Sequence, residues 1–333
     1  MALDILDPST FHHHIAQVNG IRMHYVDENP QSTNVILCCH GWPDLWYGWR
    51  HQIPFLTKKG YRVIVPDMRG FGQTEAPSDY REYGFGVISK DIASLLDHLN
   101  IPKVILLGHD WGGSVVWRFT QFYPERVIAV ASFCTPYRPQ SKEYVPLEDI
   151  IQQYPNFDYQ AYLITPEAEA EFTSNPDLFF RFMLRPPGTA STSFYNREKK
   201  TILGDKPADI PKASILPQQV LDYYIDQYKK SGFRGGLNWY KLTKINWEQC
   251  KDLDPVISHK ALMVGAGKDV ALPPRMLEGM QKFIPNVEIK VIEDSGHWIL
   301  WEKPELVNAY LDEWLDKLKD SNASPSHFIK SDL

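Results

Sequence analysis

The stretch that decides the fold is Lys103-Val-Ile-Leu-Leu-Gly-His-Asp-Trp-Gly-Gly-Ser-Val-Val-Trp117. Its apolar run at residues 104–107 predicts a buried strand, and the apolar residues from 115 to 122 recur at helical spacing. Asp110 lies between them, with glycines at both two-residue offsets. This pattern is typical of a sharp strand-to-helix turn that presents one reactive side chain. An ordinary glycine-rich turn with a surface aspartate is the alternative interpretation.

The residue at the centre of this turn decides which chemistry we expect. A serine there would suit acyl transfer, but the sequence places Asp110 at that position. A carboxylic acid with an ordinary pKa near ~3.9 is ionised at neutral pH, so it needs no base to attack carbon. The sequence therefore favours displacement at an sp³ carbon, and a serine-type esterase is disfavoured.

The overall composition is that of an ordinary globular protein. The 333 residues, 43% hydrophobic and 23% charged, suffice for one large α/β domain with an insertion. A net charge of -6 argues against a nucleic-acid partner. No apolar stretch approaches the ~18 residues of a membrane span, and the acidic N-terminus lacks signal-peptide features. The four cysteines form no disulfide framework, which favours a cytoplasmic protein with free thiols.

Strand and helix patterns alternate along most of the chain. Apolar or alternating runs predict eight strands, at residues 11–18, 21–26, 35–39, 62–66, 104–107, 127–133, 261–265 and 287–292. Helical spacing predicts helices at residues 45–56, 88–99, 273–284 and 304–318, besides the helix of the opening stretch. We therefore predict an α/β fold, an eight-stranded, mostly parallel sheet with helices on both faces.

The alternation stops between residues 139 and 251. There, helical patterns at 167–172 and 218–230 are separated by Pro- and Gly-rich turns. We interpret this segment as a helical cap inserted between the two parts of one core, residues 1–138 and 252–320.

Residues 321–333 are predicted to form a polar, disordered tail. The last three, Ser331-Asp-Leu333, resemble the peroxisomal address Ser-Lys-Leu. The middle residue carries the opposite charge, so the cytoplasm is favoured over the peroxisome.

Three side chains that suit acid–base and nucleophilic chemistry follow predicted strand ends. They are Asp110, Asp269 and His297, in the chain order nucleophile, acid, histidine. Because the carboxyl ends of parallel strands meet at one edge of a sheet, we expect these residues to lie together. The other candidate loop for the acid, Cys134-Thr-Pro-Tyr137, offers no carboxylate. We therefore predict that Asp269 orients His297.

These residues, together with His40-Gly-Trp-Pro43, resemble the epoxide hydrolase branch of the α/β-hydrolase fold, whose core haloalkane dehalogenases share. Two cap segments, Phe157-Asp-Tyr-Gln-Ala-Tyr162 and Ser231-Gly-Phe-Arg-Gly-Gly-Leu-Asn-Trp-Tyr240, resemble those that carry the epoxide-activating tyrosines of soluble epoxide hydrolases. The resemblance spans about residues 11–318 and is strongest to the hydrolase domain of the mammalian soluble enzyme. That enzyme's N-terminal phosphatase domain has no counterpart here, so a single activity is expected.

The resemblance implies that an epoxide and water become a vicinal diol in two steps. Asp110 would open the ring and form an alkyl ester. The leaving alkoxide is a poor leaving group and needs proton donors, a role that the resemblance assigns to Tyr159 and Tyr240.

In the second step, His297 would act as general base for the water that hydrolyses the ester, with Asp269 holding its imidazole. The backbone N–H groups of Trp42 and Trp111 are the candidates for the oxyanion hole. Pro43 restricts Trp42 to extended conformations and permits a cis peptide bond. Further substrate contacts are expected from Trp111, Phe157, Gln160, Trp239 and Trp298. We expect no cofactor and no metal.

Two other functions use the same residues differently. A haloalkane dehalogenase would also use Asp110 as nucleophile, with an indole N–H such as that of Trp111 near the halide. A non-catalytic small-molecule receptor would use the cap as a ligand-gated surface. The expected partners are a small-molecule epoxide and water, with no nucleic acid and no membrane, and a homodimer is a further candidate assembly.

Overall fold

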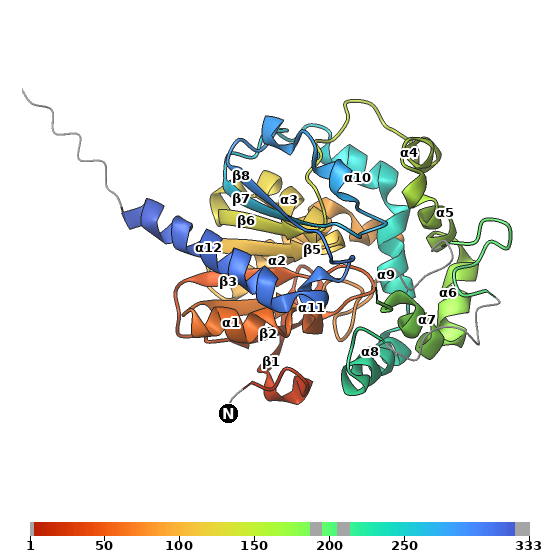
Figure 1. Cartoon of the computed structure of the whole chain (residues 1–333), viewed down its shortest axis with the longest axis horizontal. Coiled ribbons are helices and arrows are strands. Elements are labelled where there is room, and N and C mark those ends of the chain that lie inside the picture. The colour runs from red at the N-terminus through yellow and green to blue at the C-terminus, as the bar shows by residue number, and fades with distance from the viewer. Residues whose placement is uncertain (1–2, 187–194, 205–213, 324–333) are drawn as a thin grey trace, which may run out of the picture.

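The computed structural model of the chain describes residues 3–186, 195–204 and 214–323. Eight strands form one sheet in the order β1-β2-β4-β3-β5-β6-β7-β8 (Figure 1). The strands are β1 His13–Val18, β2 Ile21–Glu28, β3 Val35–Cys39, β4 Arg62–Pro66, β5 Val104–His109, β6 Val127–Phe133, β7 Lys260–Ala266 and β8 Val287–Ile292. β2 pairs antiparallel with β1 and β4, and the remaining pairs are parallel. The predicted fold class is confirmed.

Strand burial follows position in the sheet. β3 and β5 lie in its centre and are buried along their whole length, which explains their uninterrupted apolar sequence. β1 is an edge strand, and its first three residues are exposed. β1 and β2 form a hairpin, with Asn19 at φ +45° and Gly20 at φ +80° in its turn.

Helices cover both faces of the sheet. The core contains α1 Gln52–Lys58, α2 Phe85–His98, α3 Trp111–Phe122, α11 Ile299–Glu302 and α12 Pro304–Ala323. Short 3₁₀ turns lie at η1 Pro8–Thr10, η2 Trp46–Trp49, η3 Tyr80–Tyr83, η4 Pro124–Arg126, η7 Pro274–Leu277 and η8 Met280–Lys282. α2 and α3 pack together on one face, while α1 and α12 contact each other in front of the sheet in Figure 1.

Several predicted elements differ by one to three residues at their ends, and three predictions need further correction. Residues 273–284 form the two turns η7 and η8 instead of one helix, because Gly279 between them is left-handed, with φ +81°. Residues 45–56 divide into η2 and the start of α1, which carries Pro54 in its first turn, where a missing N–H costs nothing. α12 continues to Ala323, so the tail predicted from residue 321 begins too early. Residues 324–333 lie outside the described part.

The described residues between β6 and β7 form helices and one isolated bridge, Asn196 to Thr201. The helices are α4 Leu147–Gln153, α5 Tyr159–Leu163, α6 Pro166–Ser174, α7 Pro176–Met183, α8 Gln218–Ser231, α9 Arg234–Asn238 and α10 Thr243–Cys250, with 3₁₀ turns η5 Pro155–Phe157 and η6 Trp239–Lys241. We call residues 139–251 the cap. Figure 1 shows α5 to α9 on the right, beyond the carboxyl ends of the parallel strands.

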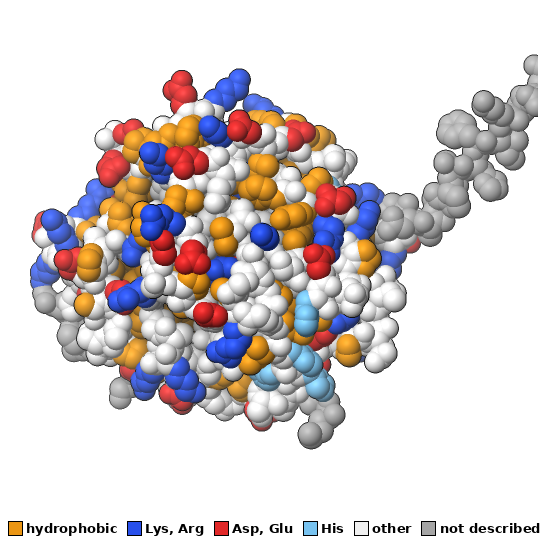
Figure 2. Space-filling view, turned by 180° about the vertical axis from the view of Figure 1, so that it is seen from behind, with side chains coloured by type: hydrophobic (Ala, Val, Ile, Leu, Met, Phe, Trp, Pro, Cys, Tyr) orange, Lys and Arg blue, Asp and Glu red, His pale blue; other side chains and the backbone are white. Residues whose placement is uncertain are grey.

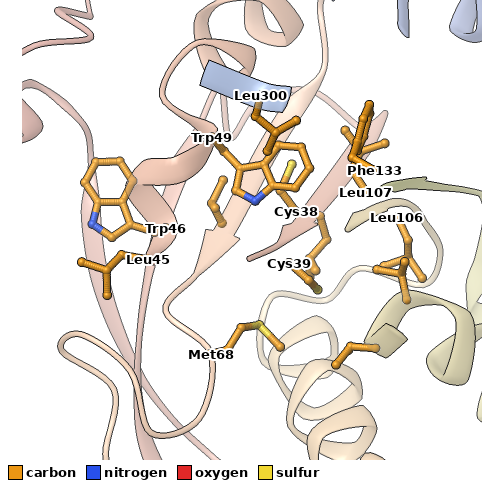
Figure 3. Packing of buried hydrophobic residues seen from close by; sticks show 14 of the residues in the cluster. Cys38, Cys39, Leu45, Trp46, Trp49, Met68, Leu106, Leu107, Phe133 and Leu300 are labelled. Atoms are coloured by element: carbon orange, nitrogen blue, oxygen red, sulfur yellow. The ribbon is translucent and has the colours of Figure 1, made fainter. Parts of the chain in front are cut away.

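One cluster of buried apolar side chains runs through both core and cap. In Figure 3, Trp49 lies close to Leu300 and Cys38, and its ring packs edge-on against Phe133 at 5.8 Å. All four cysteines are buried and free. Burial raises the pKa of the Cys38 thiol well above its ordinary value, so this thiol stays protonated and packs as a small apolar group.

The surface mixes charges of both signs. On the face shown in Figure 2, acidic and basic side chains alternate with small apolar areas. The described residues include no helix that is long and apolar enough to cross a membrane.

A chain of hydrogen bonds fastens the N-terminal segment to the sheet. Asp67 Oδ2 lies 2.8 Å from His24 Nδ1, and His24 Nε2 lies 2.8 Å from His13 Nδ1. His13 Nε2 in turn lies 2.8 Å from the carbonyl oxygen of Pro8 in η1. Asp67 also accepts the N–H of Trp46, at 3.0 Å. The segment before β1 is thus attached through side chains to the end of β4.

The turn between β5 and α3 is as tight as its glycines predicted. Asp110 has φ +54° and ψ -123°, a conformation that is strained for a residue with a side chain. A Cβ on Gly108 would lie 2.3 Å from the carbonyl oxygen of Gly112. A Cβ on Gly112 would lie 2.1 Å from the carbonyl oxygen of Cys39 in β3. Glycine at these positions therefore lets α3 lie against the sheet.

We predict that Gly112→Ala lowers the free energy of unfolding by about 2–3 kcal/mol, since backbone must move to admit the methyl group. The control is Gly20→Ala, where φ is +80° but no atom lies within 4 Å of the added Cβ. It should cost only about 1 kcal/mol of conformational strain. Urea denaturation measures both, and equal losses would show that close approach is unimportant at Gly112.

Candidate active site

The three predicted catalytic side chains lie together at the carboxyl ends of the strands. Asp110 follows β5, Asp269 follows β7, and His297 lies between β8 and α11. His297 Nδ1 is 2.7 Å from Asp269 Oδ2, and its Nε2 is 3.4 Å from Asp110 Oδ2. The imidazole thus lies between two carboxylates, and a proton on either nitrogen faces an acceptor.

Asp269 is held by its own turn. Its Oδ1 accepts the backbone N–H groups of Ala271 and Leu272, each at 2.9 Å, which leaves Oδ2 for His297. Burial opposes ionisation of this carboxyl, but His297 and the two N–H groups outweigh it and hold its pKa below the ordinary value. Asp269 is therefore a fixed negative charge behind the imidazole.

The charge of His297 depends on both acids. Burial disfavours the imidazolium, but Asp269 and Asp110 together raise the pKa of His297 well above its ordinary value. With both carboxylates ionised, His297 is thus protonated at neutral pH.

The carboxylate of Asp110 rests against a backbone donor. Asp110 Oδ1 accepts the N–H of Trp42 at 2.7 Å, and the Trp42–Pro43 peptide bond is cis. A Cβ on Gly41 would lie 2.2 Å from the same oxygen, so only glycine allows this approach. Trp111 is the first residue of α3, where N–H groups have no partner within the helix. Both predicted oxyanion donors therefore flank Asp110.

Tyr159 and Tyr240 bring their rings down from the cap. Their centroids are 6.4 Å apart, and Tyr240 packs edge-on against Trp42 at 5.5 Å and Trp111 at 5.2 Å. Burial, and then the charge of Asp110, raise the pKa of Tyr159 well above its ordinary value. Burial likewise raises the pKa of Tyr240, with Tyr159 and Asp110 adding to the effect. Both phenols keep their protons and can act as donors.

Two cavities, each of about 180 Å³, meet at Asp110. Asp110, Tyr159 and Tyr240 line both of them. The walls of the first include Trp42, Phe182, Met183, Arg185, Val270 and Trp298. The walls of the second are completed by Trp111, Ser114, Thr135, Phe157, Gln160 and Leu272. A bound molecule can thus extend on either side of the carboxylate.

Four of the five predicted substrate contacts line these cavities, Trp298 the first and Trp111, Phe157 and Gln160 the second. The prediction for Trp239 needs correction, because it lines neither. Its indole N–H donates to the carbonyl of Arg69 at 3.1 Å, and its ring packs behind Trp111 at 6.0 Å. Trp239 therefore supports the wall and is not part of its surface.

Sequence reasoning missed two residues that contact the loop of His297. His109 Nε2 donates to the carbonyl oxygen of His297 at 2.8 Å, and burial lowers the pKa of His109 to about 4, so its ring is neutral. Glu302 accepts backbone N–H groups on both sides of His297. The available signals were a histidine directly before the predicted nucleophile and a lone acid that ends the apolar run 298–301.

Among the described residues, His109, Cys134 and His297 bring possible metal-ligand atoms within 4.8 Å of one another. Burial raises the pKa of the Cys134 thiol well above its ordinary value, which opposes the thiolate that a metal would need. Both ring nitrogens of His297 already face carboxylates. The group therefore suits acid–base chemistry better than metal binding.

Comparisons with known proteins agree with this geometry. A family model described as alpha/beta hydrolase fold matches residues 34–304. Epoxide hydrolase A of Mycobacterium tuberculosis is 33% identical over 321 residues, which cover 92% of this chain and 97% of that protein. The chain belongs to the epoxide hydrolase family.

The chain is also similar to other members of the epoxide hydrolase family. Mouse bifunctional epoxide hydrolase 2 is 40% identical over 311 residues, which cover 91% of this chain and 55% of that protein. The chain thus spans about half the length of this relative. The crystal structure of epoxide hydrolase A from Mycobacterium thermoresistibile superposes with a TM-score of 0.81 at 32% identity, over 92% of this chain and 98% of that one. The resemblance stated from the sequence is confirmed.

We predict that Asp269→Asn lowers the pKa of His297, because one of the two carboxylates that favour the imidazolium is removed while burial still opposes it. NMR titration of the imidazole measures this shift. In the unaltered protein the folded pKa lies above the unfolded one, so the stabilisation is complete below ~6.5 and lost as pH rises through the folded value.

The matched control for this titration is Asp294→Asn. Asp294 lies in the same loop, is fully exposed and pairs with Lys303. It should leave the His297 titration unchanged, and an unchanged titration in Asp269→Asn as well would contradict the electrostatic account.

Proposed function

We propose that this member of the epoxide hydrolase family converts epoxides to vicinal diols through an alkyl ester on Asp110. The observation that carries the proposal is the shared lining of the two cavities. Asp110, Tyr159 and Tyr240 border both, so a three-membered ring between them has a nucleophile on one side and two hydroxyl donors on the other. The substrate is a small-molecule epoxide, and water is the second reactant.

Ring opening uses Asp110 and the tyrosines. Oδ2 of Asp110, the oxygen that faces His297 and is not bonded to Trp42, attacks a ring carbon, and the C–O bond breaks as Tyr159 and Tyr240 donate to the departing oxygen. The product of this step is a hydroxyalkyl ester on Asp110.

Ester formation also prepares the base for the second step. It replaces the charge of Asp110 by a neutral ester, which removes one of the two carboxylates that raise the pKa of His297. The imidazolium then releases its proton more readily to solvent, which restores the proton that a tyrosine gave to the departing oxygen. The neutral imidazole, with Asp269 behind it, takes a proton from water. Water attacks the ester carbonyl, and the N–H groups of Trp42 and Trp111 stabilise the oxyanion.

The tyrosine pair favours an epoxide over the alternatives. A haloalkane needs a halide site and no proton donor for its leaving group, so chloride release without diol formation would favour a dehalogenase. Ligand-dependent partner binding without turnover would favour a receptor. The buried free cysteines support a cytoplasmic site of action, and assembly as a homodimer stays a prediction that light scattering tests.

We predict that Tyr159→Phe and Tyr240→Phe each slow ester formation, and that the double variant slows it by about 10²–10⁴-fold, the usual worth of general acid catalysis. Single-turnover kinetics with excess enzyme measure the step. Tyr162→Phe is the control, because Tyr162 belongs to the same helix as Tyr159 but donates to Glu171 and lines neither cavity. An unimpaired double variant would remove both phenols from the mechanism.

The origin of the new oxygen tests the ester directly. In a single turnover in ¹⁸O-water with excess enzyme, we expect largely unlabelled diol and label in the peptide that contains Asp110, because the transferred oxygen comes from the carboxylate. Repeated turnovers should then pass the label into product. Fully labelled diol in the first turnover would instead make Asp110 a general base for direct hydration.

A further inference from the structure

We propose that Glu302 is a positioning residue for His297, required for hydrolysis of the ester and dispensable for ring opening. The inference rests on the proposed function, because His297 acts as a base only in the second step of that scheme. Glu302 ends α11, and its side chain reaches back over the loop that carries the base.

The carboxylate of Glu302 bridges the two backbone N–H groups that flank His297. Its Oε2 accepts the N–H of Gly296 at 2.7 Å, and its Oε1 accepts the N–H of Trp298 at 3.1 Å. Oε2 also lies 3.3 Å from the hydroxyl of the fully buried Ser295. The loop is therefore fixed on both sides of the base by one side chain.

We call the two hydrogen bonds from Glu302 the clamp. The clamp matters because Trp298, the residue after His297, is also attached to the cap. The indole N–H of Trp298 donates to the carbonyl of Met183 at the end of α7, at 2.9 Å. A displacement of this part of the cap, whose Met183 lines the first cavity, would therefore be transmitted to the neighbour of the base. Glu302 bonds the backbone of Trp298 to the end of α11, whereas the Trp298 indole is bonded to the cap.

The orientation of the His297 imidazole depends on the backbone of residues 296–298. Its Nδ1 must stay at Asp269 while Nε2 faces Asp110, and His109 fixes only the carbonyl of His297. A displacement of about 1 Å at a reacting group can cost about 100-fold in rate. Glu302 borders the first cavity, but its hydrogen bonds go to Ser295, Gly296 and Trp298, which have no part in the ring-opening step of the proposed scheme. We therefore expect ring opening to proceed without these bonds.

A carboxylate suits this role and an amide does not. Both backbone groups are donors, and an ionised carboxylate offers an acceptor on each oxygen. In Glu302→Gln, one end of the side chain becomes a donor and faces an N–H. This isosteric change therefore breaks one of the two bonds with no change in volume.

The test measures the two half-reactions separately with styrene oxide in single turnovers. We expect Glu302→Gln to slow ester hydrolysis at least 10-fold and to change ester formation less than 2-fold, with ester accumulating in the peptide that contains Asp110. Glu305→Gln is the matched control, since it removes the same charge three residues away from an exposed side chain. It should leave both rates unchanged, while His297→Gln marks the complete block of hydrolysis.

The outcomes separate this inference from the proposed function. If the unaltered protein forms no ester, the proposed function fails whatever Glu302 does. If it forms ester and Glu302→Gln slows both steps equally, or neither, the positioning role is refuted. Should Glu302→Gln not fold, Glu302→Asp provides the same comparison, because it keeps both acceptors but is too short to bridge the two N–H groups. A selective loss of hydrolysis at unchanged melting temperature supports positioning.

Discussion

The close approach of Gly112 to the carbonyl of Cys39 is the constraint on which the site depends. It brings the start of α3 against β3 and forces Asp110 into a left-handed backbone conformation. The carboxylate then points away from the sheet toward the N–H of Trp42, where only a glycine at position 41 leaves room for it. Backbone strain at one residue is thus balanced by contacts of two neighbouring strands, as is common at functional sites.

The cap supplies the neutral hydroxyl groups that cover the charged side chains of the site. Two carboxylates and one imidazolium carry the charge in the site, where His297 lowers the pKa of Asp269 and the two carboxylates raise the pKa of His297. Tyr159 and Tyr240 cover this group with neutral phenols, whose burial keeps their protons in place. Excluding water in this way strengthens each remaining electrostatic interaction. Nucleophile, base and donors therefore share one low-dielectric space although they come from distant parts of the chain.

The sequence alone was sufficient to predict an element where its local pattern is compatible with only one kind of structure. Buried central strands need apolar runs, and β3, β4 and β6 have the predicted bounds. The edge strand β8, in which apolar and charged residues alternate, also has its predicted bounds. The order of Asp110, Asp269 and His297 along parallel strands implies a common edge. Predictions failed where tertiary packing decides the backbone conformation or the hydrogen-bond partner of a residue. The apolar spacing of residues 273–284 reads as a helix, but Gly279 takes a left-handed conformation in its tertiary setting. Trp239 and Glu302 have roles that depend on which backbone groups lie beside them, and no periodicity encodes that.

The hydrogen-bond chain from Asp67 through His24 and His13 to Pro8 has a consequence for proton binding. Three links in series need three protons, whereas two neutral imidazoles supply two. Burial opposes ionisation of Asp67, yet His24 and backbone donors hold its pKa below the ordinary value, so the carboxylate does not supply the third proton. Burial lowers the pKa of His13, which favours the neutral form of that ring. All three links can therefore form together only when one additional proton is bound, and without it one link is open. Attachment of the N-terminal segment is therefore coupled to hydrogen-ion activity.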